Sequence, residues 1–218
     1  MKRYRVLFFI LLLTSISMAC QMAVQLTDQF SSPGEAIFRD DFSQPFNGWL
    51  RGTELPNDGI SDYVDGSFRI FVNEPNFDYW SVPALEFMNT RIEVDAVKQA
   101  GPDINRFGLI CRYLDESNYY FFIISSDGYY GVGKVKDDQL SLIGMDEMLP
   151  SIAIQAASGL NHLRADCIDS QLTFFVNGQL VAQVFDSDFP NGDVGILAGT
   201  FNEPGVDILF DNFVVVKP

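Results

Sequence analysis

The stretch Phe107–Val135 constrains the fold of this chain more than any other part of the sequence. It reads FGLICRYLDESNYYFFIISSDGYYGVGKV, in which aromatic and β-branched residues alternate with turn residues such as Ser126-Asp127-Gly128. Aromatic and β-branched side chains favour strands, whereas short polar residues and glycine favour the turns between them. The stretch therefore predicts three consecutive antiparallel strands in one sheet.

The same pattern recurs along the chain. Asp65-Gly66 precedes Ser67–Val72, and Asn177-Gly178 lies between Leu172–Val176 and Gln179–Phe185. An Asx-Gly pair between alternating runs is a strong hairpin signal, because both central residues of the tight turn need a positive φ. Further strands are predicted at Ile37–Phe42, Thr90–Val97, Arg106–Tyr113, His162–Cys167, Gly192–Ala198 and Val206–Val216. No segment after Ala36 shows a helical period, although Met145–Ser158 is open between a loop and a short helical turn.

So many antiparallel strands must close into two packed sheets to hide their edges. We therefore expect an all-β fold, a two-sheet antiparallel jelly-roll sandwich of about 12–14 strands, over residues 36–218. In such sandwiches the terminal strands often lie side by side, and both ends of this segment are good strands.

The N-terminus has the plan of a secretory signal peptide. Met1–Arg5 holds three cations, Val6–Leu13 is an uninterrupted apolar run, and Thr14–Ala19 contains small residues. This is the order of the charged, apolar and cleavage regions of a signal, and the apolar run is too short for a permanent membrane span. We expect residues 1–19 to be removed.

Cys20 follows Ser17-Met18-Ala19 and resembles the invariant cysteine of bacterial lipoproteins, which is acylated after cleavage. It departs from that pattern at Ser17, where the family usually has leucine. The resemblance implies a lipid anchor in the cell membrane, with residues 20–35 as the tether and the domain facing outside the cytoplasm. Ser-Met-Ala also suits an ordinary signal peptidase, so secretion without a lipid is the alternative.

The formal net charge of −15 limits the classes of partner that the chain is expected to bind. An acidic chain disfavours nucleic acid and anionic membrane surfaces, which attract basic patches. The surplus of Asp and Glu is expected to keep an exported domain soluble, with divalent-cation binding as the alternative. The sequence contains no glycine-rich phosphate loop, no CxxC and no basic stripe, so nucleotide and zinc-ribbon classes have no support.

Cys111 and Cys167 remain as a pair if Cys20 carries lipid. Both lie on the apolar side of predicted strands, and disulfides persist in exported proteins. We predict a disulfide between them, with two buried free thiols as the alternative.

An ordered set of short motifs resembles the concanavalin A-like lectin/glucanase superfamily, within it laminin G-like jelly rolls and bacterial 3-keto-disaccharide hydrolase-like domains. The motifs, in chain order, are Asp40-Asp41-Phe42-Ser43, Trp49, Tyr63–Ile70, Phe107–Tyr113, Asn118-Tyr119-Tyr120, Phe175-Val176-Asn177-Gly178 and Phe210-Asp211-Asn212-Phe213. The resemblance implies a twisted two-sheet sandwich whose concave sheet is the usual ligand face. It does not imply one function.

Two sequence features bear on whether the chain has a catalytic site. Glu93-Val94-Asp95 resembles part of the motif of family 16 of the glycoside hydrolases, which has a second Glu two or three residues later; here Ala96, Val97 and Lys98 follow. That mechanism needs a pair of carboxylates about 5 Å apart. His162 is the sole histidine, so a Ser-His-Asp triad or a multi-His zinc site has no support. We assign no catalytic residue.

A ligand face is predicted on one side of the central sheet. Its members on neighbouring strands are Arg112, Tyr120, Tyr130 and Lys134, and Trp80 is expected to approach them from a preceding loop. Aromatic rings stack on the apolar faces of sugars, and Arg and Lys donate hydrogen bonds to hydroxyls or carboxylates. Tyr119 and Phe121 are then expected on the opposite, buried face. The alternative is that the tyrosines cap the core and Arg112 pairs with a surface acid.

Asp40, Asp41 and Asp211, with Asn212, could meet if the terminal strands pair. Clustered hard oxygens suit calcium, so a structural calcium is a further hypothesis, and no other cofactor is expected. The alternative is that these are ordinary polar residues of strands and turns.

Taken together, the sequence predicts an exported, lipid-anchored, non-catalytic domain that binds a carbohydrate or cell-envelope glycan. A structural or protein-interaction domain at the cell surface is the first alternative, and a glycoside hydrolase is the second.

Overall fold

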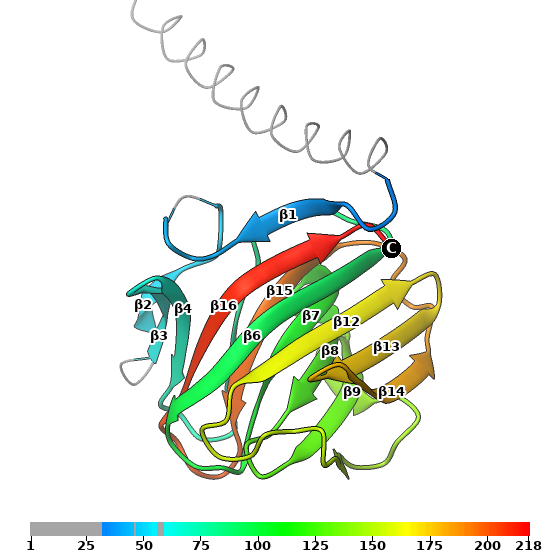
Figure 1. Ribbon diagram of the computed structural model, residues 1–218. Helices are drawn as coiled ribbons and strands as arrows, with labels where there is room; N and C mark the ends of the chain where they lie inside the picture. Colours follow the sequence, from blue (N-terminus) through cyan, green and yellow to red (C-terminus); the bar gives the residue numbers. More distant parts are fainter. Residues whose placement is uncertain (1–31, 46, 56–58) are drawn as a thin grey trace, which may run out of the picture.

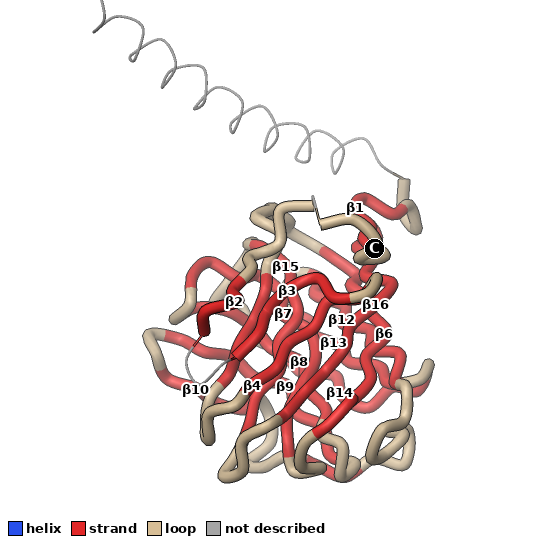
Figure 2. Tube along the Cα trace, turned by 90° about the vertical axis from the view of Figure 1, so that its left-hand side faces the viewer, coloured by secondary structure: helices blue, strands red, loops and turns tan. Residues whose placement is uncertain are grey.

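The computed structural model describes residues 32–45, 47–55 and 59–218, with side chains described except at residues 53–55. Within these ranges every regular element is a β-strand, and the strands form two antiparallel sheets (Figures 1 and 2). The expectation of an all-β jelly-roll sandwich is confirmed. The described residues form 16 strands, more than expected, because several strands are only two to four residues long.

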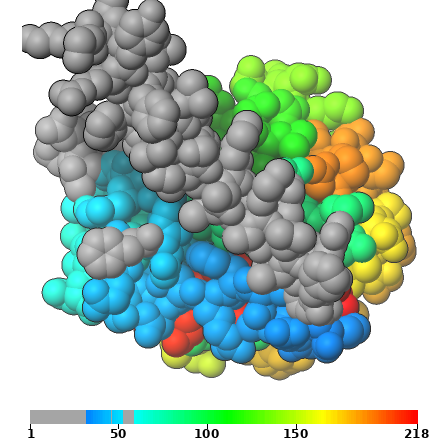
Figure 3. Space-filling view, turned by 90° about the horizontal axis from the view of Figure 1, so that it is seen from above, coloured from blue at the N-terminus to red at the C-terminus, as the bar shows by residue number. Residues whose placement is uncertain are grey.

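One sheet has nine strands. Their order is β14 (Gln179–Phe185), β13 (Gln171–Val176), β12 (Asn161–Ile168), β6 (Thr90–Ala100), β16 (Val206–Val216), β4 (Ser67–Val72), β3 (Gly59–Val64) and β2 (Gly52–Leu55), with β1 (Ala36–Asp40) paired to β16. The terminal strands β1 and β16 thus lie side by side, as predicted. Seen from above, blue atoms of the first described residues lie against red atoms of the C-terminal end (Figure 3).

The other sheet has seven strands. Their order is β10 (Gln139–Leu142), β9 (Tyr129–Lys136), β8 (Asn118–Ile124), β7 (Asn105–Asp115), β15 (Asp193–Thr200) and β5 (Asp78–Ser81), with β11 (Leu149–Pro150) paired to β9. β7, β8 and β9 are the three strands predicted from the stretch Phe107–Val135. Residues 145–158 form a loop around β11, not a helical turn.

The predicted tight turns have the backbone that their sequences favour. Asp65 and Gly66 have φ angles of 50° and 81°, and Asn177 and Gly178 have 51° and 77°. Positive φ at both central residues matches the right-handed twist of the flanking strands. These turns set the register of the β3–β4 and β13–β14 hairpins.

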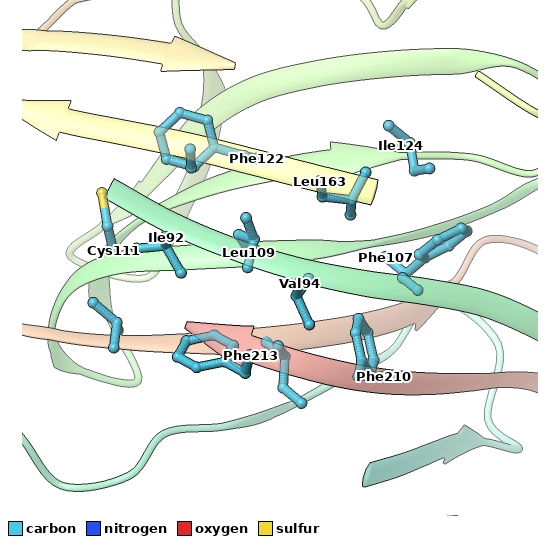
Figure 4. Close-up of a cluster of buried hydrophobic side chains, with 14 of the residues drawn as sticks. Ile92, Val94, Phe107, Leu109, Cys111, Phe122, Ile124, Leu163, Phe210 and Phe213 are labelled. Carbon is cyan, nitrogen blue, oxygen red and sulfur yellow. The ribbon is translucent and has the colours of Figure 1, made fainter. Parts of the chain in front are cut away.

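The main core fills the space between the sheets. Side chains from β6, β12 and β16 meet those from β7 and β8, and every labelled residue in Figure 4 is buried. Cys111 on β7 and Cys167 on β12 form a disulfide, so the covalent link joins the two sheets. The predicted pairing is confirmed.

Candidate functional site

The outer, solvent-facing side of the seven-stranded sheet carries a second apolar cluster. Its buried members are Ile110, Tyr119, Phe121, Ile123, Val135 and Leu197, with Trp80, Tyr113, Leu142 and Met148 packed against them. Successive residues of a strand point to opposite faces, so these side chains are on the other side of the sheet from the main core. Apolar clusters on the outside of a sandwich mark candidate interaction surfaces. We call this cluster the aromatic face.

A hollow of about 140 Å³ lies in the aromatic face. Glycines of β9 help to make it, because Gly133 is opposite Phe121 and Gly131 is opposite Ile123. A Cβ at Gly133 would overlap the Phe121 ring and lie 2.5 Å from the Ser141 carbonyl oxygen. Glycine inside a strand often marks such a close approach.

One end of the hollow is polar. Arg106 on β7 donates from Nε to Asp78 Oδ1 on β5 at 2.5 Å, and its guanidinium carbon lies 4.7 Å from the Phe201 ring centroid. Burial raises the pKa of Asp78, and the nearby Arg106 cation opposes that rise without cancelling it. The pair places a fixed donor and a fixed acceptor beside an apolar floor.

Three aromatic rings gather at the β5 side of this face. The Tyr119 ring lies 5.7 Å from Tyr113 and 6.2 Å from Trp80, measured between centroids. Trp80 donates from Nε1 to the Tyr113 hydroxyl at 3.3 Å. Burial raises the pKa of Tyr113 and of Tyr119 above that of an exposed phenol. Such rings offer flat apolar area with polar edges.

Of the predicted ligand residues, Trp80 is on this face and Arg112 is not. Arg112 is 2% exposed and has φ of 52°, at a bulge where the register of β7 against β8 shifts. It donates to the Phe189 carbonyl at 2.8 Å and to the Met88 carbonyl and Asn89 Oδ1 at 3.4 Å. The prediction for Arg112 is wrong because the bulge redirects it into the end of the sandwich, and Tyr113 occupies the outer position.

The prediction for Tyr120 is wrong by one residue of alternation. Tyr120 is fully buried in the main core, opposite Cys111, whereas Tyr119 and Phe121 point outward. Its hydroxyl donates to Asp186 Oδ1 at 2.6 Å and accepts from the Phe189 amide at 3.1 Å. The alternative reading, in which this tyrosine caps the core, is the one the structure supports.

Tyr130 and Lys134 share the inner side of β9 with Val132. Tyr130 packs against the main core. Lys134 forms ion pairs with Asp186 and Asp188, and Asp186 is also the partner of Tyr120. Lys134 therefore ties β9 to the segment that follows β14, and the predicted five-residue ligand set is not brought together.

The terminal aspartates lie near the paired ends of the chain, but Asp40 is fully engaged by protein donors. It accepts from the Phe42 amide at 2.7 Å, from Trp49 Nε1 at 2.9 Å and from the Tyr63 hydroxyl at 3.2 Å. Asp41 accepts from Ser43, and Asp211 Oδ1 accepts from the Asn212 amide. Over the described ranges no group of three or more His, Cys, Asp or Glu residues has the geometry of a metal site. This arrangement speaks against Asp40 as a calcium ligand.

Glu93 and Asp95 lie on the outer side of the nine-stranded sheet, as expected. His162 Nδ1 is 2.8 Å from Asp95 Oδ1, and its Nε2 is 3.4 Å from Glu93 Oε2. Asn212 Nδ2 donates to Asp95 Oδ2 at 3.0 Å. The acids therefore belong to a polar network on the sheet opposite the aromatic face.

Sequence reasoning missed Arg106, Asp78, Tyr113 and Tyr119. The β7–β8 hairpin contained a signal: with a two-residue turn at Glu116-Ser117, odd-numbered residues of β7 lie opposite even-numbered residues of β8, so a core Cys111 favours burial of the even-numbered set that includes Tyr120. Gly131 and Gly133 in β9 were a second signal, because glycine inside a strand often marks a close approach of other groups.

Cys20 and the expected signal peptide lie outside the described residues. Among the residues that are described, none belongs to a helix long and apolar enough to cross a membrane.

No family model and no curated protein matches the chain. Several solved structures have a similar fold. The carbohydrate-binding module CBM66 from Bacillus subtilis aligns with a TM-score of 0.61 and 16% identity, over 78% of this chain and 96% of that one. A Bacillus subtilis protein of unknown function with a galectin-like fold aligns at 0.60 and 13%, over 85% and 97%. Bacillus licheniformis β-glucanase aligns at 0.58 and 12%, over 83% and 98%. The chain therefore shares the two-sheet β-sandwich fold of these proteins.

Proposed function

We propose that this protein is an exported glycan-binding domain whose ligand lies on the aromatic face. The observation that carries the proposal is the meeting of Trp80, Tyr113 and Tyr119 with the Arg106–Asp78 pair on one solvent-facing sheet surface. Rings of this kind stack on the apolar faces of sugars, and a charged donor and acceptor at the edge select hydroxyl positions. The neighbour whose name describes carbohydrate binding supports the same class of ligand.

The charge of the chain narrows the ligand class. With a formal net charge of −15, the protein repels polyanions at long range. We therefore propose a neutral glycan, not an acidic one.

We propose binding without hydrolysis. Two carboxylates flank the scissile bond in most glycoside hydrolases. In the described part of the chain, the hollow of the aromatic face is lined by one carboxylate, that of Asp78, and Arg106 pairs with it. Glu93 and Asp95 are on the opposite sheet, where His162 and Asn212 hold them.

A protein-interaction domain remains a second candidate, and one observation favours it. Much of the hollow is aliphatic, with Ile123, Leu142, Met148 and Leu197 in its lining. Aliphatic side chains suit an apolar peptide segment better than a bare sugar, because they offer no hydrogen bonds.

Glycan-array screening of the purified protein, followed by calorimetric titration of any hit, tests the main proposal. Tyr113→Ala should weaken binding by up to about tenfold, since an aromatic contact of this kind contributes about 0.5–1.5 kcal/mol. Phe175→Ala is the matched control, because Phe175 is an aromatic residue of β13 in the nine-stranded sheet, away from the aromatic face, where it contacts Arg164 of the neighbouring strand β12. Equal losses in both variants, or no glycan bound by the wild type, would count against the proposal.

We propose that Cys20 anchors the domain to the outside of the cytoplasmic membrane. The basic, apolar and small-residue order of residues 1–19 and the position of Cys20 support this. Metabolic labelling with a palmitate analogue tests it: the wild type should carry label and Cys20→Ser should not. Unlabelled wild-type protein released into the medium would favour simple secretion.

A further inference from the structure

A row of residues crosses the outer side of the seven-stranded sheet near one end of its strands. Its members are Asp78 of β5, Gly199 of β15, Arg106 of β7, Ser125 directly after β8, and Tyr129 of β9. We call it the cross-strand row. Adjacent strands lie about 4.8 Å apart, so the row is about 19 Å long and exceeds the width of one sugar ring.

The first half of the row is an ion pair that lies across a glycine. Gly199 is paired with Asp78 on one side and with Arg106 on the other. The two charged side chains meet over it, and a Cβ on Gly199 would overlap the Asp78 carboxylate. Glycine inside a strand often marks such a close approach. The absence of a side chain here keeps the pair low on the sheet, where a ligand can pass over it.

The second half of the row reaches the turn between β8 and β9. Phe107 is paired with Ile124, so the preceding Arg106 is level with Ser125. The Ser125 amide donates to the Tyr129 carbonyl at 2.8 Å, and the Tyr129 amide donates to Ser125 Oγ at 3.1 Å. Residues two apart in a strand point to the same side, so this half of the row is on the same outer side as the aromatic face.

A second hollow, of about 190 Å³, lies at the Tyr129 end of the row. We call it the end hollow. Met148 and Phe201 line both the end hollow and the hollow of the aromatic face, so the two are continuous. The Phe201 ring also contacts the Arg106 guanidinium, in the first half of the row. A ligand on the aromatic face can therefore extend past Phe201 into the end hollow.

The end hollow has the groups that hold a sugar unit. The Tyr129 side chain is 40% exposed, so part of its ring is open to a ligand. Asp127 is exposed and accepts from Ser125 Oγ, and a carboxylate has further acceptor sites for hydroxyl donors. An aromatic ring suits the apolar side of a sugar, and a carboxylate suits its hydroxyls.

We infer that the cross-strand row binds a linear neutral glycan along its length. One sugar unit lies on the aromatic face beside the Arg106–Asp78 pair, and another lies in the end hollow against Tyr129. This inference rests on the proposed function and deepens it, because it identifies the ligand as a chain of several linked sugars.

Calorimetric titration with oligosaccharides of increasing length tests the inference. The probes are cello-, laminari-, xylo-, manno- and malto-oligosaccharides, from the monosaccharide to the hexasaccharide. For at least one series the affinity should rise about tenfold or more from the disaccharide to the hexasaccharide, because only the longer chain reaches the end hollow. Tyr129→Ala should lower the hexasaccharide affinity about three- to tenfold and leave the disaccharide affinity unchanged, whereas Tyr129→Phe should keep both.

Phe185→Ala is the matched control, because Phe185 is an exposed ring on β14, at the edge of the nine-stranded sheet. It should change neither affinity. Equal affinities for disaccharide and hexasaccharide, unaffected by Tyr129→Ala, would overturn the inference, and the proposed function would stand if binding still depended on Tyr113. The inference alone would also fail if none of these series bound while another glycan on the array did. Absence of any glycan binding by the wild type would overturn both.

Discussion

Reduction of the disulfide between Cys111 and Cys167 should destabilise the protein by about 4 kcal/mol. The two cysteines are 56 residues apart, and the disulfide joins β7 of one sheet to β12 of the other. A loop of this length loses about 14 cal/mol/K of chain entropy in the unfolded state on the chain-entropy model, or about 4 kcal/mol at 25 °C. Both side chains are fully buried, so reduction without substitution tests the cross-link and leaves the packing volume unchanged.

The assay compares urea unfolding of the oxidised protein with that of protein unfolded, reduced with dithiothreitol and refolded in its presence. With a slope of about 2 kcal/mol per molar urea, the midpoint should fall by about 2 M. Thiol labelling under denaturing conditions is the control and should find two additional thiols after reduction. Coincident midpoints with both thiols released would refute the reasoning, because the unfolded chain would then gain no measurable freedom from the broken link.

Four further predictions follow from the described side chains. Tyr120→Ala should lower the free energy of unfolding by about 3–5 kcal/mol in urea titrations, as expected for a fully buried ring, whereas a surface ligand residue would cost little. Gly133→Ala should destabilise the protein by about 1–3 kcal/mol and weaken glycan binding, because the new Cβ forces Phe121 and the Ser141 carbonyl apart; unchanged stability would contradict the close approach. Burial raises the pKa of Asp193 to about 7 from 3.8, so its contribution to stability is full below about pH 4 and is lost as the pH rises through 7. Asp193→Asn should therefore remove up to about 4 kcal/mol of that pH dependence in thermal scans from pH 4 to 8, and an unaltered profile would refute the assignment. Finally, excess EDTA should leave the Tm unchanged because protein donors already occupy Asp40, and a fall in Tm would restore the calcium hypothesis.

The two outer faces of the sandwich differ in what they offer a partner. On the nine-stranded sheet, ion pairs such as Arg91–Asp166 and Arg69–Asp207 bind charged side chains to one another across neighbouring strands. On the seven-stranded sheet, an apolar and aromatic surface surrounds the Arg106–Asp78 pair. Desolvating the second face costs less and buries more apolar area, and for that reason the glycan is proposed there.

Local sequence was enough to predict the fold class, because hairpin turns and strands depend on residues that are close together in the chain. Asp65-Gly66 and Asn177-Gly178 can adopt the positive φ that a tight hairpin turn needs, and the runs beside them alternate as strands do. The pairing of Cys111 with Cys167 was also predicted from the sequence, because both cysteines lie on the apolar side of their strands and become the remaining pair if Cys20 carries lipid. The all-β class, the paired terminal strands and the disulfide were therefore predictable.

The candidate site depended on tertiary structure, and only Trp80 of the predicted ligand set lies on the aromatic face. In β8 both faces are apolar, so alternation alone does not say whether Tyr119 or Tyr120 is buried; the register against Cys111 decides it. At Arg112 a bulge with positive φ moves the next outward position to Tyr113. The arginine side chain gives no sequence signal that predicts this bulge. The sequence by itself determined the strands, the turns and the cross-link. The packing of one sheet on the other decided which side chains face solvent, because burial is a property of the assembled layers and not of any single strand.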